Sequence, residues 1–156
     1  MLTTEQAVYD AAIYKQALAM AMPEPVAKNI VAQARFETAD YTNKAFVLNN
    51  NAFGYKTFKG AKWQIGSGNV STEGDTYARY ASIQDSTGEL VSWLLRREAE
   101  HRFSIASLIS PVCYANALKG CAYYGASAKD YAAGIEKKLT ILNWQLIKTL
   151  LITIKQ

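Results

Sequence analysis

The feature that most constrains the fold is a change of character between residues 41 and 82, which separates two helical regions. This segment holds most of the glycine and asparagine of the chain, and turn-forming runs such as FG, KG, GSGN and EGD recur in it. Between the turns, KWQI and TYARYAS have strand-like composition. We therefore expect helices, a small β-hairpin lobe and more helices around one core, an α+β fold that is mostly α.

Apolar residues at helical spacing predict two helices before this lobe. The first runs from about Thr4 to Met22. The second opens at Pro23 or Pro25 in the run MPEP and ends near Thr38.

Four helical segments are predicted after the lobe. Ser86 and Glu89 have the spacing of a capping box, which predicts the start of a buried helix. A second helix, a Gly/Tyr-rich turn and a further helix from near Ala128 follow. The last segment, about 138–155, predicts an apolar helix that packs back on the domain. The alternative is a membrane-surface or virion contact through this helix, with Trp144 at the interface.

The second predicted helix carries a carboxylate on its apolar face. Val26, Ile30 and Ala34 form one stripe, and Glu37 lies within roughly 40° of that stripe around the helix axis. Desolvation and the negative end of the helix dipole both raise the pKa of a carboxyl placed there. A carboxyl that stays partly protonated near neutral pH is the general acid that glycoside hydrolysis requires. The alternative is that the helix simply ends and Glu37 turns into solvent.

The residues around Glu37 carry a resemblance to a known family. The run ARFETADYTNKAFVLNNNAFGYK contains a helix end with a carboxylate, a short loop, and then Asn-Asn-Ala-Phe-Gly. This run resembles the glucosaminidase family of peptidoglycan hydrolases, which have a lysozyme-like fold and include flagellar-rod hydrolases and autolysins. In that family an alanine-rich helix ends in a catalytic Glu, and an Asn-Leu-Phe-Gly turn enters a β lobe. The resemblance assigns the acid role to Glu37 and the turn to residues 51–54.

Two further stretches follow in the family's order. YARYASIQDSTGELVSWL is similar to its aromatic-x-x-Tyr strand and Ser-capped helix, and YANALKGCAYYGASAKDYAAGI is similar to its late Tyr-bearing turn and final helix. Together the matches run from about Ala27 to Ile135. Two departures stand out: Ala78 occupies a position where many members carry Arg, with Arg79 one place later, and the β lobe is short.

Glycoside hydrolysis usually needs a second carboxylate or a substitute for it. Glu73, in VSTEGDTYARY, resembles the family's Thr-Glu element on a hairpin that faces the acid. The resemblance therefore makes Glu73 the group that activates water. Two alternatives stay open: EGD is a solvated hairpin tip, or the N-acetyl group of the substrate assists in place of a second acid.

Aromatic and amide side chains are the expected sugar-binding groups, because sugar rings stack on aromatic faces and acetamido groups need amide partners. The chain contains ten Tyr. For each candidate the alternative is a role in the core or on the surface. The resemblance gives added support to Tyr124, for which the neighbouring Tyr123 is the competitor. The candidates are Asn51, Phe53, Tyr55, Tyr80, Tyr114 and Tyr124.

Charge and cysteine content limit other classes of function. The net charge is +4, without a dense Lys/Arg patch interleaved with aromatics, which argues against nucleic acid as a partner. Cys113 and Cys121 lack the spacing and His partners of a zinc site, so we expect no metal and no cofactor. We expect two buried thiols, although a break at Gly120 leaves a disulfide open. His101 is the only histidine, which removes most His-based catalytic schemes.

The length of 156 residues predicts a single domain. The N-terminal stretch has no basic region, and Asp10 and Lys15 interrupt its apolar run, so we expect no signal peptide. No apolar run is long enough to span a membrane. A protein of this kind that acts on the bacterial cell wall would be virion-associated or released through a membrane lesion, as a phage lytic enzyme is.

The sequence therefore predicts an endo-β-N-acetylglucosaminidase that cleaves peptidoglycan glycan strands, with Glu37 protonating the leaving oxygen. A muramidase or lytic transglycosylase on a similar fold is the alternative within enzymes. A virion or cell-wall-binding protein without turnover is the alternative from another class.

Overall fold

Two capped helices open the fold in the computed structural model, which describes residues 3–153. Helix α1 (Thr4–Ala19) begins with a capping box between Thr3 and Gln6. Helix α2 (Glu24–Glu37) begins after Pro23. Because proline has no N–H, the helix start has one fewer backbone donor to leave unpaired. The alanine-rich faces of the two helices are buried, and α1 packs against both α2 and α4 (Ile83–Ala99). Both helices end close to the residues that the sequence predicts.

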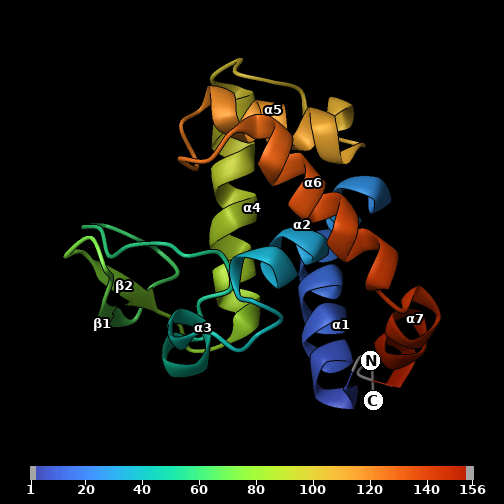
Figure 1. The fold of residues 1–156 in the computed structure, drawn as a ribbon, viewed down its shortest axis with the longest axis horizontal. Helices are drawn as coiled ribbons and strands as arrows, with labels where there is room; N and C mark the ends of the chain where they lie inside the picture. The colour runs from blue at the N-terminus through green and yellow to red at the C-terminus, as the bar shows by residue number, and fades with distance from the viewer. Residues whose placement is uncertain (1–2, 154–156) are drawn as a thin grey trace.

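The small lobe follows as one short helix and one hairpin. Helix α3 (Lys44–Asn49) is capped by Asn43, and strands β1 (Gly66–Val70) and β2 (Thr76–Arg79) pair antiparallel. A bulge separates Ser67 from Val70 in the register. The hairpin stands out from the helical body, at the left of Figure 1. The architecture is α+β and mostly α, as the sequence predicts.

The predicted strand KWQI is wrong, and the first strand is the following run GSGNV. Trp63 packs against Gly88 of α4 (Ile83–Ala99), and its indole Nε1 donates to Ser92 Oγ at 3.1 Å. The Gln64 amide donates to the Glu89 carboxylate on the same helix. These residues therefore anchor the lobe to α4. The glycine run pairs with β2 because Gly68 leaves room for the side chain of Asn49, which would lie 2.0 Å from an added Cβ.

Gly88→Ala is expected to lower the free energy of unfolding by about 1–2 kcal/mol, although alanine is the better helix former. An added Cβ would lie 2.8 Å from the Trp63 ring, which must then leave α4. Urea unfolding followed by tryptophan fluorescence measures both the stability and the displaced ring. Gly120→Ala is the matched control, since no atom lies within 4 Å of its added Cβ. Equal effects of the two substitutions would contradict the role given to Trp63.

Helix α4 begins one turn earlier than the sequence predicts. Its N-cap is Ser82, whose hydroxyl accepts from the Asp85 amide at 3.2 Å. Ser86 lies inside the helix and donates to the Ile83 carbonyl, so the predicted capping box with Glu89 is wrong. Glu89 instead faces the lobe and is only 2% exposed.

Residues 105–153 form three helices and a short 3-10 turn. Figure 1 shows α6 running diagonally from beside α5, and α7 lying beside α1. The predicted helix over 138–155 is interrupted after Ile141, where Asn143 caps a new helix by accepting from the Leu146 amide. The elements between residues 105 and 153 are η1 (Ile105–Ser107), α5 (Pro111–Gly120), α6 (Ala128–Ile141) and α7 (Trp144–Thr153).

Helix α7 packs on the domain, as predicted. Trp144 lies 5.6 Å from the Tyr14 ring, and Ile147 is fully buried. Trp144 and Leu146 are half-buried, so each keeps one face in solvent. Cys113 is exposed and Cys121 half-buried, and both are free thiols. The expectation of two buried thiols is therefore wrong.

A buried charge network lies where α2 leads into the lobe. The Arg35 guanidinium binds the Asp10 carboxylate through Nε at 2.8 Å and a terminal nitrogen at 2.6 Å, with both side chains at most 1% exposed. Arg35 also contacts Asp40, which is bound by Lys138 of α6 at 2.8 Å. Residues 39–41 all have left-handed backbone, with φ between 50° and 68°, although none is glycine. The network fixes this turn, which follows Glu37 directly.

Candidate functional site

Glu37 is the last residue of α2, and its carboxylate is held by a tyrosine from α6. Tyr131 donates its hydroxyl to Glu37 Oε1 at 2.5 Å. The Asn43 amide donates to the Glu37 main-chain carbonyl at 2.9 Å, which closes the helix end. The residue is half-buried, and burial raises the pKa of Glu37 above its usual range, while the bond from Tyr131 opposes this in part. The structure therefore gives Glu37 an environment that favours the protonated carboxyl more than water does.

Two buried side chains extend this contact into the core. Gln33, one turn before Glu37 on α2, donates its amide Nε2 to the Tyr131 oxygen at 3.0 Å. Tyr114 of α5 donates its hydroxyl to Gln33 Oε1 at 2.5 Å. Gln33 and Tyr114 are fully buried, and Tyr131 is 3% exposed. Three helices thus meet in one hydrogen-bonded line that ends on Glu37.

Tyr124 covers the Tyr131 ring. The two rings stack with centroids 3.8 Å apart and planes 7° apart. The Tyr124 hydroxyl donates to the Ala115 carbonyl at 2.8 Å, and Lys119 binds the carbonyls of residues 124–126. Tyr124, a predicted sugar contact, therefore has a clear packing role beside the site and keeps only part of its surface in solvent.

Four of the predicted sugar contacts lie in the interior. In this conformation they present no more than 3% of their surface to a ligand, and they are Asn51, Phe53, Tyr80 and Tyr114. Asn51 shows the physical reason, since its amide donates to the carbonyls of Tyr55 and Ala78 and thereby joins two segments of the lobe. Phe53 belongs to the main apolar core.

Tyr55 is half-buried, with its ring edge-on to Tyr123 at 5.9 Å. Its hydroxyl is buried and has no hydrogen-bond partner among residues 3–153. Burial raises the pKa of Tyr55 above its usual range. Tyr55 thus lies where the lobe packs against the helical body.

Glu73 lies in the exposed turn between β1 and β2. Its main-chain N–H donates to Ser71 Oγ at 3.3 Å, and no hydrogen bond or ion pair joins its carboxylate to another described side chain. The structure does not bring Glu73 into contact with Glu37. The turn is the outermost part of the hairpin in Figure 1.

A pocket lies between the start of α3 and the hairpin. Its volume is about 280 Å³, and Asn43, which binds the Glu37 carbonyl, forms part of its wall. Its lining combines apolar surface and one aromatic ring with a few amides and hydroxyls, a composition that suits a saccharide. The other lining residues are Lys44, Ala45, Asn69, Val70, Ser71, Thr72 and Tyr77.

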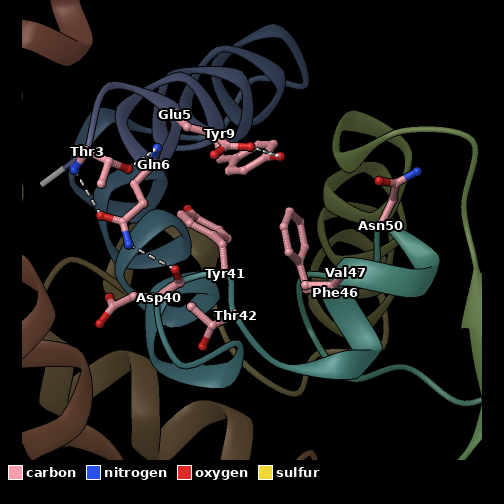
Figure 2. A pocket seen from close by; sticks show the side chains of 10 residues that line it. All are labelled: Thr3, Glu5, Gln6, Tyr9, Asp40, Tyr41, Thr42, Phe46, Val47 and Asn50. Atoms are coloured by element: carbon pink, nitrogen blue, oxygen red, sulfur yellow. Dashed lines mark hydrogen bonds between the residues drawn. The ribbon is translucent and has the colours of Figure 1, made fainter.

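A larger cavity, of about 480 Å³, lies on another side of the same turn (Figure 2). Figure 2 shows the rings of Tyr9, Tyr41 and Phe46 facing one another, and their centroids are 5.0–5.1 Å apart. Glu37 lines neither this cavity nor the smaller pocket, and the smaller pocket is the candidate because Asn43 in its wall binds the Glu37 carbonyl.

Glu89 is a further buried carboxyl, one that the sequence assigns to a helix cap. Both of its oxygens accept from the Gln64 amide, at 3.2 and 3.3 Å, and burial raises the pKa of Glu89 to about 6. Its partners are lobe residues, so it serves the docking of the lobe on α4. Among residues 3–153, no cluster of His, Cys, Asp and Glu could hold a metal ion. No helix in that range is long and apolar enough to cross a membrane.

The sequence interpretation missed Gln33 and Tyr131. Gln33 lies four residues before Glu37, a spacing that places both side chains on one face of a helix, so the pattern contained this neighbour. Tyr131 lies 94 residues from Glu37, and only the packing of α6 on α2 brings the two together.

No protein-family model and no curated protein matches the chain. Among solved structures, one chain of "Structure of a type VI secretion system effector-immunity complex from Pseudomonas protegens" is similar to it, with a TM-score of 0.58. The sequence identity is 19%, over 88% of this chain and 96% of that chain. The protein therefore shares its α+β, mostly α fold with a chain of that effector–immunity complex.

Proposed function

We propose that the protein hydrolyses the glycan strands of peptidoglycan, with Glu37 as the general acid. The observation that carries this proposal is the state of the Glu37 carboxyl. It is half-buried at a helix end, its pKa is raised by burial, and a tyrosine hydroxyl fixes its orientation. The resemblance of the surrounding run to glucosaminidases supports the bond that follows N-acetylglucosamine as the one cleaved.

In the proposed reaction, Glu37 gives its proton to the glycosidic oxygen as the bond to the sugar breaks. The sugar develops oxocarbenium character, and water then adds to its anomeric carbon. Because Glu73 is exposed and apart from Glu37, either a hairpin movement brings it to the sugar or the substrate acetamide supports the cation. Glu37 recovers its proton from water at the end of the cycle.

The pocket between Asn43 and the hairpin is the proposed place for one sugar unit. Tyr77 offers a ring to the apolar face of a pyranose, and the lining amides of Asn43 and Asn69 suit an acetamido group. These residues replace the buried side chains among the earlier candidates. They also explain why the hairpin is needed, since it supplies half of the pocket wall.

The similar solved structure supports a setting for this activity. That structure is an effector–immunity complex, so we include a protein partner in the proposal: a protein that covers the Glu37 site and blocks it. An effector of a secretion machine is then a better setting than a phage lytic enzyme.

Digestion of purified peptidoglycan, borohydride reduction and mass spectrometry of the new ends test the proposal. Reduced N-acetylglucosamine ends are the expected result. Reduced or anhydro-muramic ends would instead identify a muramidase or a lytic transglycosylase. A folded protein that binds peptidoglycan and releases no fragments would contradict the enzymatic function.

Tyr131→Phe is expected to move the alkaline limb of the kcat/KM profile to higher pH. A general acid works while protonated, so activity is lost as pH rises through the pKa of Glu37. The Tyr131 hydroxyl stabilises the ionised carboxylate and lowers that pKa, and its removal lets Glu37 keep its proton to higher pH. Rates across pH 4–9, a range of about five units around neutrality, measure the limb. A shift to lower pH would contradict the assignment.

A further inference from the structure

The hairpin is attached to α4 by two neighbouring side chains of the segment that precedes β1. The Trp63 ring packs on Gly88, and its Nε1 donates to Ser92 Oγ at 3.1 Å. The Gln64 amide nitrogen donates to both oxygens of Glu89, at 3.2 and 3.3 Å. We call this attachment the latch. It consists of Trp63 and Gln64 on one side and of Gly88, Glu89 and Ser92 on the other.

The latch moves with the hairpin that carries Glu73, because both ends of its segment are tied to β2. The Thr57 amide donates to the Thr76 carbonyl at 2.9 Å. The Ile65 amide donates to the Arg79 carbonyl, also at 2.9 Å. A rigid movement of the hairpin away from α4 therefore requires the latch to open.

Glu89 is a buried carboxyl with few partners. It is 2% exposed, and among residues 3–153 the Gln64 amide nitrogen is its one hydrogen-bond donor. An ionised carboxylate can accept about four hydrogen bonds. The Asp10 carboxylate, which is also buried, accepts three, two of them from a guanidinium. Closing of the latch therefore removes Glu89 from water without replacing most of its hydrogen bonds, which disfavours the ionised form.

The proton on Glu89 is consequently coupled to the latch. Burial raises the pKa of Glu89 from its ordinary 4.5 to about 6, and the bond from Gln64 and the charge of Arg96 oppose this in part. A group whose pKa is higher in the closed state favours closure below its open-state pKa, and this contribution is lost as pH rises through its closed-state pKa. The latch is then strongest below about pH 4.5 and has lost this contribution above about pH 6.

The other titratable and charged groups around the latch come from three segments. They are Tyr55 and Lys62 in the lobe, Arg96 on α4, and Tyr123 in the segment before α6. Burial raises the pKa of Tyr55 and of Tyr123 above the usual range, so both stay neutral while Glu89 titrates. Lys62 is exposed, with its ammonium 5.6 Å from the centroid of the Trp63 ring. Glu89 is the only carboxyl among these groups.

We propose that the latch is controlled by the proton on Glu89: it holds the hairpin on α4 at acidic pH and loosens as pH rises toward neutrality. The consequence for catalysis rests on the function proposed above, in which a hairpin movement is one of two ways to supply the second step. Loosening of the latch frees the hairpin, and with it Glu73, for that movement.

Hydrogen exchange of the Trp63 indole N–H, followed by nuclear magnetic resonance, tests the proposal without any need for activity. This proton is bound to Ser92 while the latch is closed, so its exchange rate reports how often the latch opens. Division of the wild-type rate by that of Glu89→Gln at each pH removes the intrinsic pH dependence of exchange. The ratio is expected to rise about 30-fold from about pH 4 to about pH 7, because the interval between 4.5 and about 6 corresponds to a factor of about 30. A ratio that stays level across this range would overturn the proposal.

Glu100→Gln is the matched control for this ratio. It removes an exposed carboxylate at the end of the same helix, and its Trp63 exchange is expected to follow that of the wild type at every pH. A change as large as that in Glu89→Gln would overturn the role given to the Glu89 proton.

The coupling is reciprocal, so a second measurement needs no substitution of Glu89. Gly88→Ala displaces the Trp63 ring from α4, since the added Cβ would lie 2.8 Å from it. The midpoint of the Glu89 carboxyl-carbon resonance is expected to fall from about pH 6 toward pH 4.5 in this variant, and to stay in place in Gly120→Ala. An unchanged Glu89 midpoint in Gly88→Ala would overturn the coupling.

The two proposals fail separately. A protein whose latch responds to pH and which cleaves no glycan would refute the enzymatic function and keep the latch. A protein that cleaves glycan while the exchange ratio stays level would do the opposite.

Discussion

Glu37→Gln is expected to lower kcat for the release of reducing ends from peptidoglycan by about 10²–10⁴-fold, the range that general acid catalysis contributes. The glutamine amide has the size of the carboxyl and still offers an oxygen to Tyr131, so the fold is expected to remain. What the amide cannot do is transfer a proton to the leaving oxygen. Quantifying reduced sugar ends at saturating substrate gives kcat, and circular dichroism checks the fold.

Two further carboxyl variants make this result specific. Glu136→Gln removes an exposed carboxylate on α6, away from the Glu37 contacts, and is expected to leave kcat unchanged. Glu73→Gln separates the two schemes for the second step: a large loss means that Glu73 directs water, and full activity means that the substrate acetamide serves. Full activity of Glu37→Gln would remove Glu37 from the mechanism.

Arg35→Met is expected to reduce the free energy of unfolding by about 3–5 kcal/mol, because it leaves the buried Asp10 carboxylate without its partner. Asp10 is fully buried, and Arg35 supplies two of the three hydrogen bonds that it accepts, the third coming from Tyr41. Urea unfolding followed by circular dichroism measures the loss. The left-handed turn at 39–41 loses one anchor at the same time, so glycan cleavage is also expected to fall.

A double substitution and a surface pair serve as controls. Asp10→Leu combined with Arg35→Met removes both charges, and much of the stability is expected to return, since a buried ion pair is often replaced by apolar side chains without loss. Glu100→Gln breaks a surface pair with Arg97 and is expected to cost about 0–1 kcal/mol. A loss in Arg35→Met as small as that in Glu100→Gln would contradict the structural role of the network.

The sequence was most informative where a signal lies within one element. The helix from the MPEP run to Glu37 follows from its proline start and apolar stripe, and TYAR is a strand as predicted. Glu37 stands out because a carboxylate interrupts an apolar face. Each of these signals depends on neighbours at most about four positions apart along one element, the reach of one helical turn.

The rest depended on contacts between distant segments. KWQI has strand composition, yet its Trp63 packs against Gly88 on α4. The glycine run that follows KWQI forms the strand. Ser86 and Glu89 have capping spacing, but Ser82 caps first and Glu89 binds the lobe. The burial of Asn51 and Tyr80 and the bond from Tyr131 to Glu37 are likewise outcomes of packing.

Two of the polar contacts of α6 hold the end of α2 and the turn after it: Tyr131 on Glu37 and Lys138 on Asp40. The two residues are seven positions apart, which is about two turns, so one face of one rod makes both contacts. A ligand that tilts α6 from its exposed outer side would break them together, without entering the glycan pocket. Inhibition by that route would lower kcat and leave KM for the glycan unchanged. This result distinguishes it from inhibition by a ligand that occupies the glycan pocket.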